Sequence, residues 1–458
     1  MSITFIRKVI QMKKRSTRIL SVLLAVLLFC SALLPCSFAA TAEEWDENWD
    51  RLKNDSSAVS LSPGSDPSSM NFTWLTPTDS GMVMFQIATD SSMKNGEFLK
   101  VERTHTALYG WKNDVTAENL KSDTTYYYRV AEKGKWSKTY SFNTGNEKDY
   151  SVLFVSDTQI GRSGDRKLDE VLKRDSLGWN NTLEAAVKYA PDISFMISSG
   201  DQVETAITQE QHNLFFNPEL MRSLPAATAI GNHDFYYPLY SIRSNHPNRF
   251  DRELLQCPAG KGYYFKRGEA LFIVLNSNNV LTYDHEELIK EAMEFYPDAL
   301  WRVVVMHYSI YSRNEEDNFY RPLFSRIFDK YDIDLVLSGH DHIYTRSALL
   351  RGNERVENGG TLYLEASTAS GCNYGGQPDV TPWYAEKCIQ LRTPTYVLLN
   401  FTQGKISIKA LRSDTNEVFD SYELTKAAPS NTEYKDSLLQ RLYLFFADKI
   451  FKLRDIIF

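Results

Sequence analysis

Five short apolar runs of this chain each end in an aspartate, an asparagine or a histidine. The runs are Ser151–Asp157, Ile193–Asp201, Ala226–Asp234, Trp301–His307 and Asp334–His342. Apolar runs of this length are typical of buried strands. In open α/β sheets, ligands bind just beyond the carboxyl ends of the strands. One such ending would be a coincidence, but five predict that polar side chains meet at one edge of a sheet.

The run Asp334–His342 shows the pattern most clearly, because two histidines follow its apolar residues. His340 and His342 stand one residue apart, after a break at Ser338-Gly339. In an extended segment alternate side chains share a face, so we expect both imidazoles to point the same way. Neutral imidazoles are good ligands for transition metals. Ordinary loop histidines are the alternative for one such pair, but the recurrence of the pattern favours a metal site.

A β-rich region precedes these runs. From about Val59 to Thr144, aromatic and β-branched residues alternate or cluster, with Pro, Gly, Asn and Asp between the clusters. Short strands without a helical period predict a β-sandwich over residues 59–145. The N-terminal arm at residues 41–58 contains the acidic stretch Ala42–Asp55, which we expect to be a short helix or an extended arm.

Helical segments and strands alternate after a linker at Gly145–Asp149. We predict helices at Asn181–Ala190 and Phe319–Tyr331 from their helical spacing and, for the first, a plausible cap. Three further strand-like stretches without metal-binding side chains are assigned to a second sheet: Tyr263–Asn276, Gly360–Ser367 and Tyr396–Leu411. The predicted fold class is therefore mixed α+β and α/β. An N-terminal β-sandwich is followed by a four-layer α/β/β/α domain at residues 150–412, and a final strand and linker occupy residues 413–434.

The first 40 residues have the features of a secretory signal peptide. Basic residues such as Lys13 and Arg18 precede the apolar run Ile19–Leu34, and Ser37-Phe-Ala39 is a small-x-small cleavage signal. A retained membrane anchor is the alternative, although the apolar run is short for a membrane span. We therefore expect a secreted, extracellular or cell-surface protein.

The chain without its first 40 residues would be strongly acidic. Residues 1–40 carry six basic side chains and no acid, so their removal takes the formal net charge from −7 to −13. This charge disfavours nonspecific binding to nucleic acid, and we expect none. The length of 458 residues allows two or three domains.

The cysteines that remain after cleavage are odd in number. They are Cys257, Cys372 and Cys388. For an exported protein this indicates one disulfide and one free thiol. We expect Cys372–Cys388 as the pair, and the sequence leaves the pairing open.

The C-terminal residues 435–458 have a strongly amphipathic helical pattern. Arg441 and Lys452 fall on the face opposite Leu442, Phe445 and other apolar residues. Three roles remain open for this helix: packing on the protein's own surface, contact with a membrane surface, or pairing with another chain. The oligomeric state is not predicted.

The polar strand endings form a set of motifs with a fixed order along the chain. They are D-x-Q (Asp157, Gln159), G-D-x-x-E (Asp201, Glu204), G-N-H-D (Asn232, His233), V-x-x-H (His307) and G-H-x-H (His340, His342). Their order and context resemble the calcineurin-like metallophosphoesterases. With the β-rich domain in front, the purple acid phosphatase branch is the nearer match, and the resemblance covers residues 59–412. Leu120–Val130 and Trp136–Thr144 also resemble the E–F corner and the closing strand of fibronectin type III domains.

The resemblance implies two metal ions bridged by the carboxylate of Asp201. The implied ligands are Asp157 and His342 for the first ion, and Asn232, His307 and His340 for the second. His233 would be the catalytic residue that faces the phosphate and either stabilises the transition state or protonates the leaving oxygen. A metal pair about 3.5–4 Å apart would lower the pKa of a bound water and clamp the displacement at phosphorus.

The chain departs from this family pattern at two positions. Gln159 stands where many members have histidine, and Glu204 stands where purple acid phosphatases have a tyrosinate ligand. Either side chain could complete the first site. We favour Gln159, because it lies one residue beyond Asp157, and the alternative is that Glu204 orients a histidine or a water. Without the tyrosinate, a purple colour is not expected, and the metals remain open among iron, manganese and zinc.

The residues on the substrate side are less well defined. Tyr308 and Arg313 follow His307, and Tyr344 and Arg346 follow His342. Arginine suits the geometry of phosphate, so these four are candidate substrate-binding residues. Surface salt bridges are the alternative role for the two arginines.

The predicted function is that of a secreted, dinuclear metal-dependent phosphatase that hydrolyses phosphomonoesters. A phosphodiesterase or nucleotide phosphatase of the same fold is one alternative, which a panel of aryl phosphate, bis-aryl phosphate and nucleotides would separate. A non-catalytic binding protein at the cell surface is the other, and a metal-to-protein ratio near zero would support it.

Overall fold

The structure, a computed structural model, describes residues 42–164, 167–313, 320–426 and Lys449. The expected signal peptide at residues 1–40 lies outside the described residues, as does the expected C-terminal helix at 435–458 apart from Lys449. Within the described residues no helix is both long enough and apolar enough to span a membrane.

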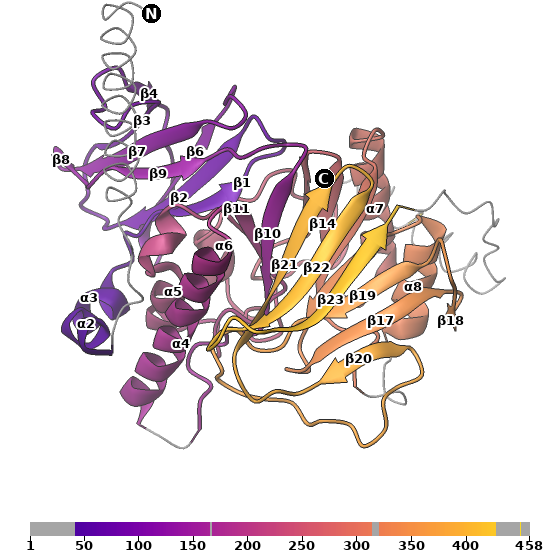
Figure 1. Cartoon of the computed structure of the whole chain (residues 1–458). Helices are drawn as coiled ribbons and strands as arrows, with labels where there is room; N and C mark the ends of the chain where they lie inside the picture. Colours follow the sequence, from indigo (N-terminus) through magenta and orange to yellow (C-terminus); the bar gives the residue numbers. More distant parts are fainter. Residues whose placement is uncertain (1–41, 165–166, 314–319, 427–448, 450–458) are drawn as a thin grey trace, which may run out of the picture. The chain divides into compact units, whose positions relative to one another are not determined.

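The N-terminal region is a sandwich of two antiparallel sheets (Figure 1). One sheet has the order β1-β2-β6-β5, and the other has the order β4-β3-β7-β8 with β9 also paired to β7. The bounds are β1 Ser60–Pro63, β2 Met70–Thr76, β3 Val83–Ala88, β4 Glu97–Leu99, β5 Glu102–Thr106, β6 Gly110–Ala117, β7 Thr125–Glu132, β8 Lys135–Trp136 and β9 Tyr140–Asn143. The predicted β-sandwich is confirmed.

Aromatic side chains from both sheets fill the centre of the sandwich. Phe72 of β2 lies with its ring 4.7 Å from that of Phe85 and 5.0 Å from that of Tyr128. All three side chains are fully buried. Because paired aromatic rings add to the free energy that their burial contributes, this cluster stabilises the packing of the two sheets against each other.

Two further sheets form the domain that follows. The first has the order β12-β11-β10-β21-β22-β23, and the second has the order β13-β14-β15-β16-β19-β17-β18 with β20 paired to β17. The bounds are β10 Tyr150–Val155, β11 Ile193–Ser198, β12 Ala226–Thr228, β13 Tyr263–Arg267, β14 Ala270–Val274, β15 Trp301–Tyr308, β16 Leu335–Gly339, β17 Tyr344–Arg351, β18 Glu354–Arg355, β19 Thr361–Glu365, β20 Ala385–Ile389, β21 Thr395–Thr402, β22 Lys405–Arg412 and β23 Val418–Thr425. Strands β10, β11 and β12 are parallel, and so are β14, β15, β16 and β19.

Alternation along a strand decides which layer each side chain joins. In β15, Val303 and Val305 pack into the core between the two sheets, whereas Val304 and Met306 pack on the outer face. That outer face is covered by α7 (Thr282–Phe295) and α8 (Arg321–Lys330), which bury their apolar sides against it. Because both faces are covered, the strand is apolar throughout, as parallel strands usually are.

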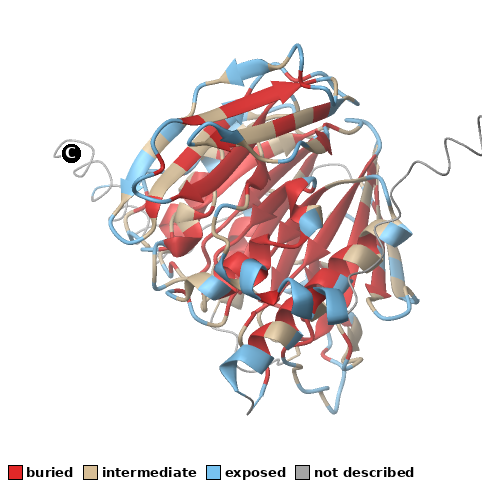
Figure 2. Ribbon diagram, turned by 90° about the vertical axis from the view of Figure 1, so that its left-hand side faces the viewer, coloured by how far each residue is buried: buried red, intermediate tan, exposed pale blue. Residues whose placement is uncertain are grey.

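Helices cover the first sheet as well, which completes the predicted four-layer α/β/β/α order. Helix α4 (Leu168–Tyr189) contacts β21 and α5 (Gln209–Phe216). Figure 1 shows α4 and α5 on one side of the sheets and α7 and α8 on the other. In Figure 2 the buried strands lie inside, while exposed residues lie on helix surfaces, on loops and on outer strands of the sandwich. Shorter helical segments are η1 (Glu219–Arg222) and α6 (Leu239–Ile242).

The sequence predictions of individual elements agree with this fold in part. The assignment of Tyr396–Leu411 to the second sheet is wrong, because β21 and β22 extend the first sheet beside β10. The helix predicted at Asn181–Ala190 is the second half of α4, and α8 matches the one predicted at Phe319–Tyr331. The stretches predicted as strands at Tyr263–Asn276 and Tyr396–Leu411 are each two strands joined by a turn. The turns contain Gly268 and Gly404, whose φ angles of 53° and 75° require glycine-like freedom.

The N-terminal arm is helical and attached to the phosphoesterase-like domain. It forms α2 (Ala42–Glu47) and α3 (Trp49–Asn54). The indole of Trp45 donates a hydrogen bond to Ser176 of α4 at 3.1 Å, and Trp49 donates to Asp169 at 2.9 Å. The two tryptophans thus hold the arm against α4.

The expected Cys372–Cys388 disulfide is wrong for this structure. All three cysteines of the described residues carry free thiols. Cys372 is buried beneath the strand ends, where its sulfur lies 3.4 Å from the Thr368 hydroxyl. The Cys388 sulfur instead accepts a contact from Thr345 at 3.6 Å. Spacing in the sequence could not reveal this, because the two thiols face different neighbours.

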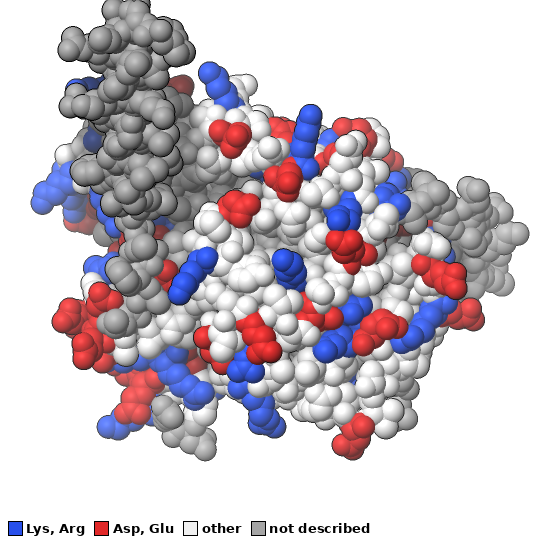
Figure 3. Space-filling view, viewed as in Figure 1, with Lys and Arg blue, Asp and Glu red and all other residues white. Residues whose placement is uncertain are grey.

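Charged side chains of both signs are mixed on the face drawn in Figure 3. Exposed ion pairs of the described residues include Lys405–Glu423 at 2.8 Å and Arg412–Asp414 at 2.7 Å. Exposed pairs each contribute less than about 1 kcal/mol to stability.

The sandwich and the following domain are joined by buried hydrogen bonds. The Tyr128 hydroxyl donates to the Arg222 carbonyl at 2.8 Å, and the Ser60 hydroxyl donates to the Arg243 carbonyl at 2.9 Å. Both donors are buried. Since a buried carbonyl left without a donor is costly, these bonds hold the two domains in register.

We predict that Tyr128→Phe destabilises the protein by about 1–3 kcal/mol, because it leaves the Arg222 carbonyl without its donor. The midpoint of urea unfolding would measure the change. Tyr127→Phe is the matched control, since Tyr127 is only partly buried and its substitution should be nearly neutral. Equal midpoints for the two variants would contradict a stabilising role for this hydrogen bond.

Candidate active site and metal centre

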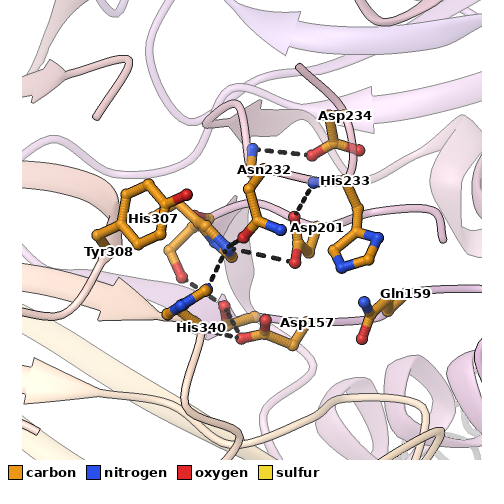
Figure 4. A network of polar contacts seen from close by, with 12 residues as sticks. Asp157, Gln159, Asp201, Asn232, His233, Asp234, His307, Tyr308 and His340 are labelled. Atoms are coloured by element: carbon orange, nitrogen blue, oxygen red, sulfur yellow. Dashed lines mark hydrogen bonds and ion pairs between the residues drawn. The ribbon is translucent and has the colours of Figure 1, made fainter. Parts of the chain in front are cut away.

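The five polar strand endings meet at one place, as the sequence predicted. Strands β10, β11 and β12 of the first sheet end before Asp157, Asp201 and Asn232, while β15 and β16 of the second sheet bring His307 and His340. Figure 4 shows these side chains pointing toward one another. Because parallel strands of two facing sheets end at the same edge, residues far apart in the sequence converge there.

His307 is the centre of this cluster. Its Nε2 lies 3.0 Å from Asn232 Oδ1, 3.3 Å from Asp201 Oδ2 and 3.3 Å from His340 Nδ1. Its Nδ1 faces the Ser199 carbonyl at 3.2 Å, which orients the ring. Ligand atoms of Asp201, His307 and His340 all lie within 4.8 Å of one another. A carboxylate and two imidazoles at this spacing can hold a transition metal ion.

Asp157 is fully buried, and its two oxygens have different surroundings. Oδ2 accepts hydrogen bonds from the Ser156 hydroxyl at 2.5 Å and from the His340 backbone N–H at 2.9 Å. Oδ1 has no hydrogen-bond partner, and His342 Nε2 lies 3.4 Å from it. A buried carboxylate oxygen without a donor is costly unless a cation faces it.

The cluster residues hold a backbone conformation that L-amino acids rarely adopt. Five of them have φ between 38° and 83°: Asp157, Gln159, Asp201, His340 and His342. Left-handed backbone at non-glycine residues costs of order 1–3 kcal/mol each and concentrates at functional sites. The surrounding hydrogen bonds therefore hold a strained arrangement at each strand end.

The two histidines of the last motif converge, but not for the reason we inferred from the sequence. His340 contacts His307, and His342 lies beside Asp157, so both imidazoles reach the cluster. The expectation of an extended segment is wrong, because the φ angles of His340 and His342 are 83° and 54°. A left-handed turn, rather than strand alternation, brings the rings together.

Glycine is required at two of the strand ends. A Cβ at Gly339 would collide with Ser156 and with the carboxylate of Asp157. A Cβ at Gly200, whose φ is 120°, would lie 2.7 Å from His307 Nδ1. The absence of a side chain at these positions lets the strand ends of the two sheets approach each other.

The electrostatics of the cluster favour a bound cation. Burial acts to lower the pKa of His307, but the Asp201 carboxylate outweighs it and raises the pKa to about 9. For Asp201, burial acts to raise the pKa, and His307 outweighs it and lowers the pKa. A field that holds a proton on a buried imidazole also attracts a metal ion, which displaces that proton when it binds.

Asp234 supports the loop that carries Asn232 and His233. Its carboxylate accepts hydrogen bonds from the backbone N–H groups of Gly231 at 2.9 Å and of Gln202 at 3.2 Å. Burial, with the nearby Asp201 charge, raises the pKa of Asp234 to about 7. The sequence analysis assigned no role to Asp234. The signal that could have identified it is its position as the last residue of the G-N-H-D motif.

His233 lines the hollow beside the cluster. Its backbone N–H donates to Asp201 Oδ1 at 2.8 Å, and its Nδ1 lies 2.9 Å from the Glu204 carbonyl. With Nδ1 donating to that carbonyl, Nε2 is the ring nitrogen left to exchange a proton with a ligand. The Glu204 carboxylate lies 3.4 Å from His233 Nδ1 and 3.0 Å from Arg162.

The two side chains that could complete the first metal site are placed differently. Gln159 is buried to 2% exposure and lines the hollow, with its Oε1 3.9 Å from the Cys372 sulfur. The Glu204 carboxylate pairs with Arg162 through Oε1, whereas its Oε2 is buried, has no hydrogen-bond partner and lies 3.4 Å from His233 Nδ1. That Gln159 and not Glu204 completes the first site stays a prediction.

The hollow over the cluster has a volume of about 300 Å³. Its lining includes Gln159, Arg162, Asp201, Asn232, His233, Arg313, His340, Asp341, His342 and the segment Asn373–Gly376. Sequence reasoning missed Arg162, Asp341 and Asn373–Gly376. The glycines of this segment were a turn signal, but nothing in the sequence placed that turn beside the histidines.

Of the four candidate substrate-binding residues, only Arg313 lines the hollow. The ring of Tyr308 instead packs edge-on against the ring of His340, with 4.5 Å between the two ring centroids. Tyr344 and Arg346 are not among the residues that line the hollow. Both bind Asp420, the tyrosine hydroxyl at 2.8 Å and the arginine Nε at 2.7 Å, because β17 turns them toward β23.

Two family models match successive parts of the chain. The purple acid phosphatase N-terminal domain matches residues 56–144, and the calcineurin-like phosphoesterase model matches residues 150–344. The chain combines these two domains. The likeness of the first domain to fibronectin type III remains a prediction.

Curated relatives support the same assignment. The Fe(3+)-Zn(2+) purple acid phosphatase 12 of Arabidopsis thaliana is 24% identical over 62% of this chain and 62% of its own. The phosphoenolpyruvate phosphatase of Allium cepa is 25% identical over 52% of this chain and 51% of its own. The chain thus spans about half to three fifths of the length of these relatives.

Solved structures share the fold. A purple acid phosphatase from yellow lupin (Lupinus luteus) seeds aligns with a TM-score of 0.65 and 15% identity, covering 83% of this chain and 77% of its own. PhoD aligns with a TM-score of 0.55 and 12% identity, covering 88% of this chain and 98% of its own. The predicted order of sandwich and phosphoesterase domain is confirmed.

We predict that Ser156→Ala weakens metal binding by about 10–100-fold, because the Ser156 hydroxyl orients Asp157 from behind the candidate ligand cluster. Competition with a chelator would measure the affinity. Ser151→Ala, at the other end of the same strand, is the matched control. If both variants bind metal as the unmodified protein does, Ser156 has no orienting role.

Proposed function

We propose that this protein is a dinuclear metal-dependent phosphatase that hydrolyses phosphomonoesters. The observation that carries the proposal is the cluster of the buried residues Asp157, Asp201 and His307 with the partly buried His340, in which one carboxylate oxygen of Asp157 has no donor. The family models and the phosphatases among the curated relatives support the reaction class.

The donor set fits two transition metal ions. Asp157, His342 and Gln159 would hold the first ion, and Asn232, His307 and His340 would hold the second, with Asp201 as the bridge. Mixed imidazole, amide and carboxylate donors favour iron, manganese or zinc over magnesium or calcium. The Arabidopsis relative is named for an Fe(3+)-Zn(2+) pair, and the identity of the ions in this chain is open.

The bound ions would lower the pKa of the attacking water and neutralise charge on the phosphoryl oxygens. The residues of the chain place the substrate around them. Asp201 accepts a hydrogen bond from the backbone N–H of His233, which fixes the loop that carries His233. In its imidazolium form His233 would donate the Nε2 proton to the leaving oxygen, while Nδ1 keeps its own proton and donates to the Glu204 carbonyl, which fixes the ring.

Export is part of the proposal and rests on the sequence of residues 1–40, with their basic start and apolar run. Contact of residues 435–458 with a membrane surface stays a prediction. The proposed partner is a phosphate ester, and no nucleic acid partner is proposed.

We predict that Asp201→Asn abolishes hydrolysis of 4-nitrophenyl phosphate and lowers the metal-to-protein ratio, because the amide cannot balance two cations as a carboxylate does. The release of 4-nitrophenolate and the elemental analysis of the purified protein give the two readouts. The exposed Asp192→Asn is the matched control. Activity and metal content equal to the control would refute the proposed function.

We predict that His233→Ala lowers kcat by about 10²–10⁴-fold for phosphate esters of poor leaving groups. The loss should be smaller for 4-nitrophenyl phosphate, because 4-nitrophenolate leaves without protonation. Parallel assays with phenyl phosphate and 4-nitrophenyl phosphate at saturating substrate would compare the two losses. An equal loss on both substrates would assign His233 to charge stabilisation instead of proton donation.

A further inference from the structure

We propose that Arg313 binds a second anionic group of the substrate, so that the site selects phosphomonoesters whose leaving group carries a carboxylate. This inference rests on the proposed phosphatase function and adds the class of substrate. It makes Arg313 a specificity-determining residue, separate from the groups that would hold the phosphoryl being transferred.

Arg313 lines the hollow, and its charged guanidinium makes few contacts with other groups. Its Nε is buried and has no hydrogen-bond partner. Its Nη1 reaches the Gly376 carbonyl only at 3.4 Å, and the carboxylate of Asp341 lies 3.9 Å from Nε, beyond hydrogen-bonding distance. Among the described residues, these contacts leave most of its five N–H donors available.

The other arginine of the hollow differs in this respect. Arg162 donates to the Glu204 carboxylate at 3.0 Å and so is already paired. Its side chain is also more exposed, at 44% compared with 28% for Arg313. A partly buried guanidinium is the better anion site, because its charge is less screened by water.

The segment facing Arg313 leaves room for a ligand. A Cβ at either Gly375 or Gly376 would lie 3.2 Å from Arg313 Nη1. Two successive glycines thus keep the guanidinium uncovered on that side. A planar guanidinium binds a carboxylate or a phosphate through two parallel hydrogen bonds, so the free face matches those two groups.

The position of Arg313 favours a second anion over the transferred phosphoryl. The phosphoryl is expected at the cluster of Asp201, His307 and His340, where cations would balance it. Arg313 lies instead beside Asp341, whose backbone N–H is held by Glu365 at 3.1 Å. Arg313 lines the same hollow as the cluster, and its contacts are with Asp341 and Gly376 and not with the candidate metal ligands, which leaves it available for a second anionic group.

The test compares matched substrates on the unmodified protein and on Arg313→Gln. The substrates are 2-, 3- and 4-carboxyphenyl phosphate, each paired with its neutral methyl ester, together with phenyl phosphate. We expect kcat/KM to favour at least one carboxylate over its ester by about 10-fold or more, because only the carboxylate forms charge-assisted hydrogen bonds with the guanidinium. In Arg313→Gln this preference should fall below about threefold, while kcat/KM for phenyl phosphate should change little.

A binding measurement separates recognition from turnover. Calorimetric titration with benzylphosphonate and with its ring-carboxylated analogues should show tighter binding of one carboxylated form, and Arg313→Gln should remove the difference. Lys94→Gln, an exposed residue of the sandwich, is the matched control for the loss of one positive charge. Thermal unfolding of Arg313→Gln would show that the variant is folded.

The outcomes separate this inference from the proposed function. If Arg313→Gln lowers kcat/KM equally for phenyl phosphate and the carboxylated esters, Arg313 acts on the transferred phosphoryl and the second-anion subsite is refuted. If no carboxylate is preferred by the unmodified protein, the inference is also refuted while the phosphatase function stands. If the unmodified protein with its metals hydrolyses none of the esters, the proposed function itself fails.

Discussion

The contact between Asp201 and His307 joins the two sheets of the larger domain at the point where the candidate site lies. Asp201 follows β11 of the first sheet, His307 lies in β15 of the second, and their side chains approach to 3.3 Å. Neither residue is exposed. Two buried polar groups from separate sheets can persist there only because each compensates the desolvation of the other, or because a cation compensates both.

This constraint explains why the strand ends are strained and rich in glycine. Asp157, Asp201 and His340 have left-handed backbones, and Gly200 and Gly339 stand where a Cβ would collide with neighbouring groups of the site. Burial of the apolar core between the sheets offsets the free-energy cost of these strained strand ends, since Phe154, Val305 and their neighbours are completely buried. A rigid core can thus hold polar groups in a conformation that local preferences disfavour.

The substrate side of the site is built from different parts of the chain. Arg162, Arg313 and the segment Asn373–Gly376 surround the strand ends with polar and charged groups. These residues lie in loops between the secondary-structure elements, where substitution changes recognition without disturbing the core. Reaction type and substrate choice therefore have separate structural origins, one in the strand ends and the other in the loops.

Much of this protein followed from its sequence alone. Apolar runs ending in Asp157, Asp201, Asn232, His307 and His340 determined that polar groups would meet at a sheet edge, because strand burial and side-chain type are local properties. Only the tertiary structure decided that His340 and His342 converge through a left-handed turn, that Cys372 and Cys388 face different neighbours, and that Arg346 binds Asp420 while Arg313 faces the hollow. These outcomes depend on which distant segments come to lie side by side, and the order of residues along the chain does not contain that proximity.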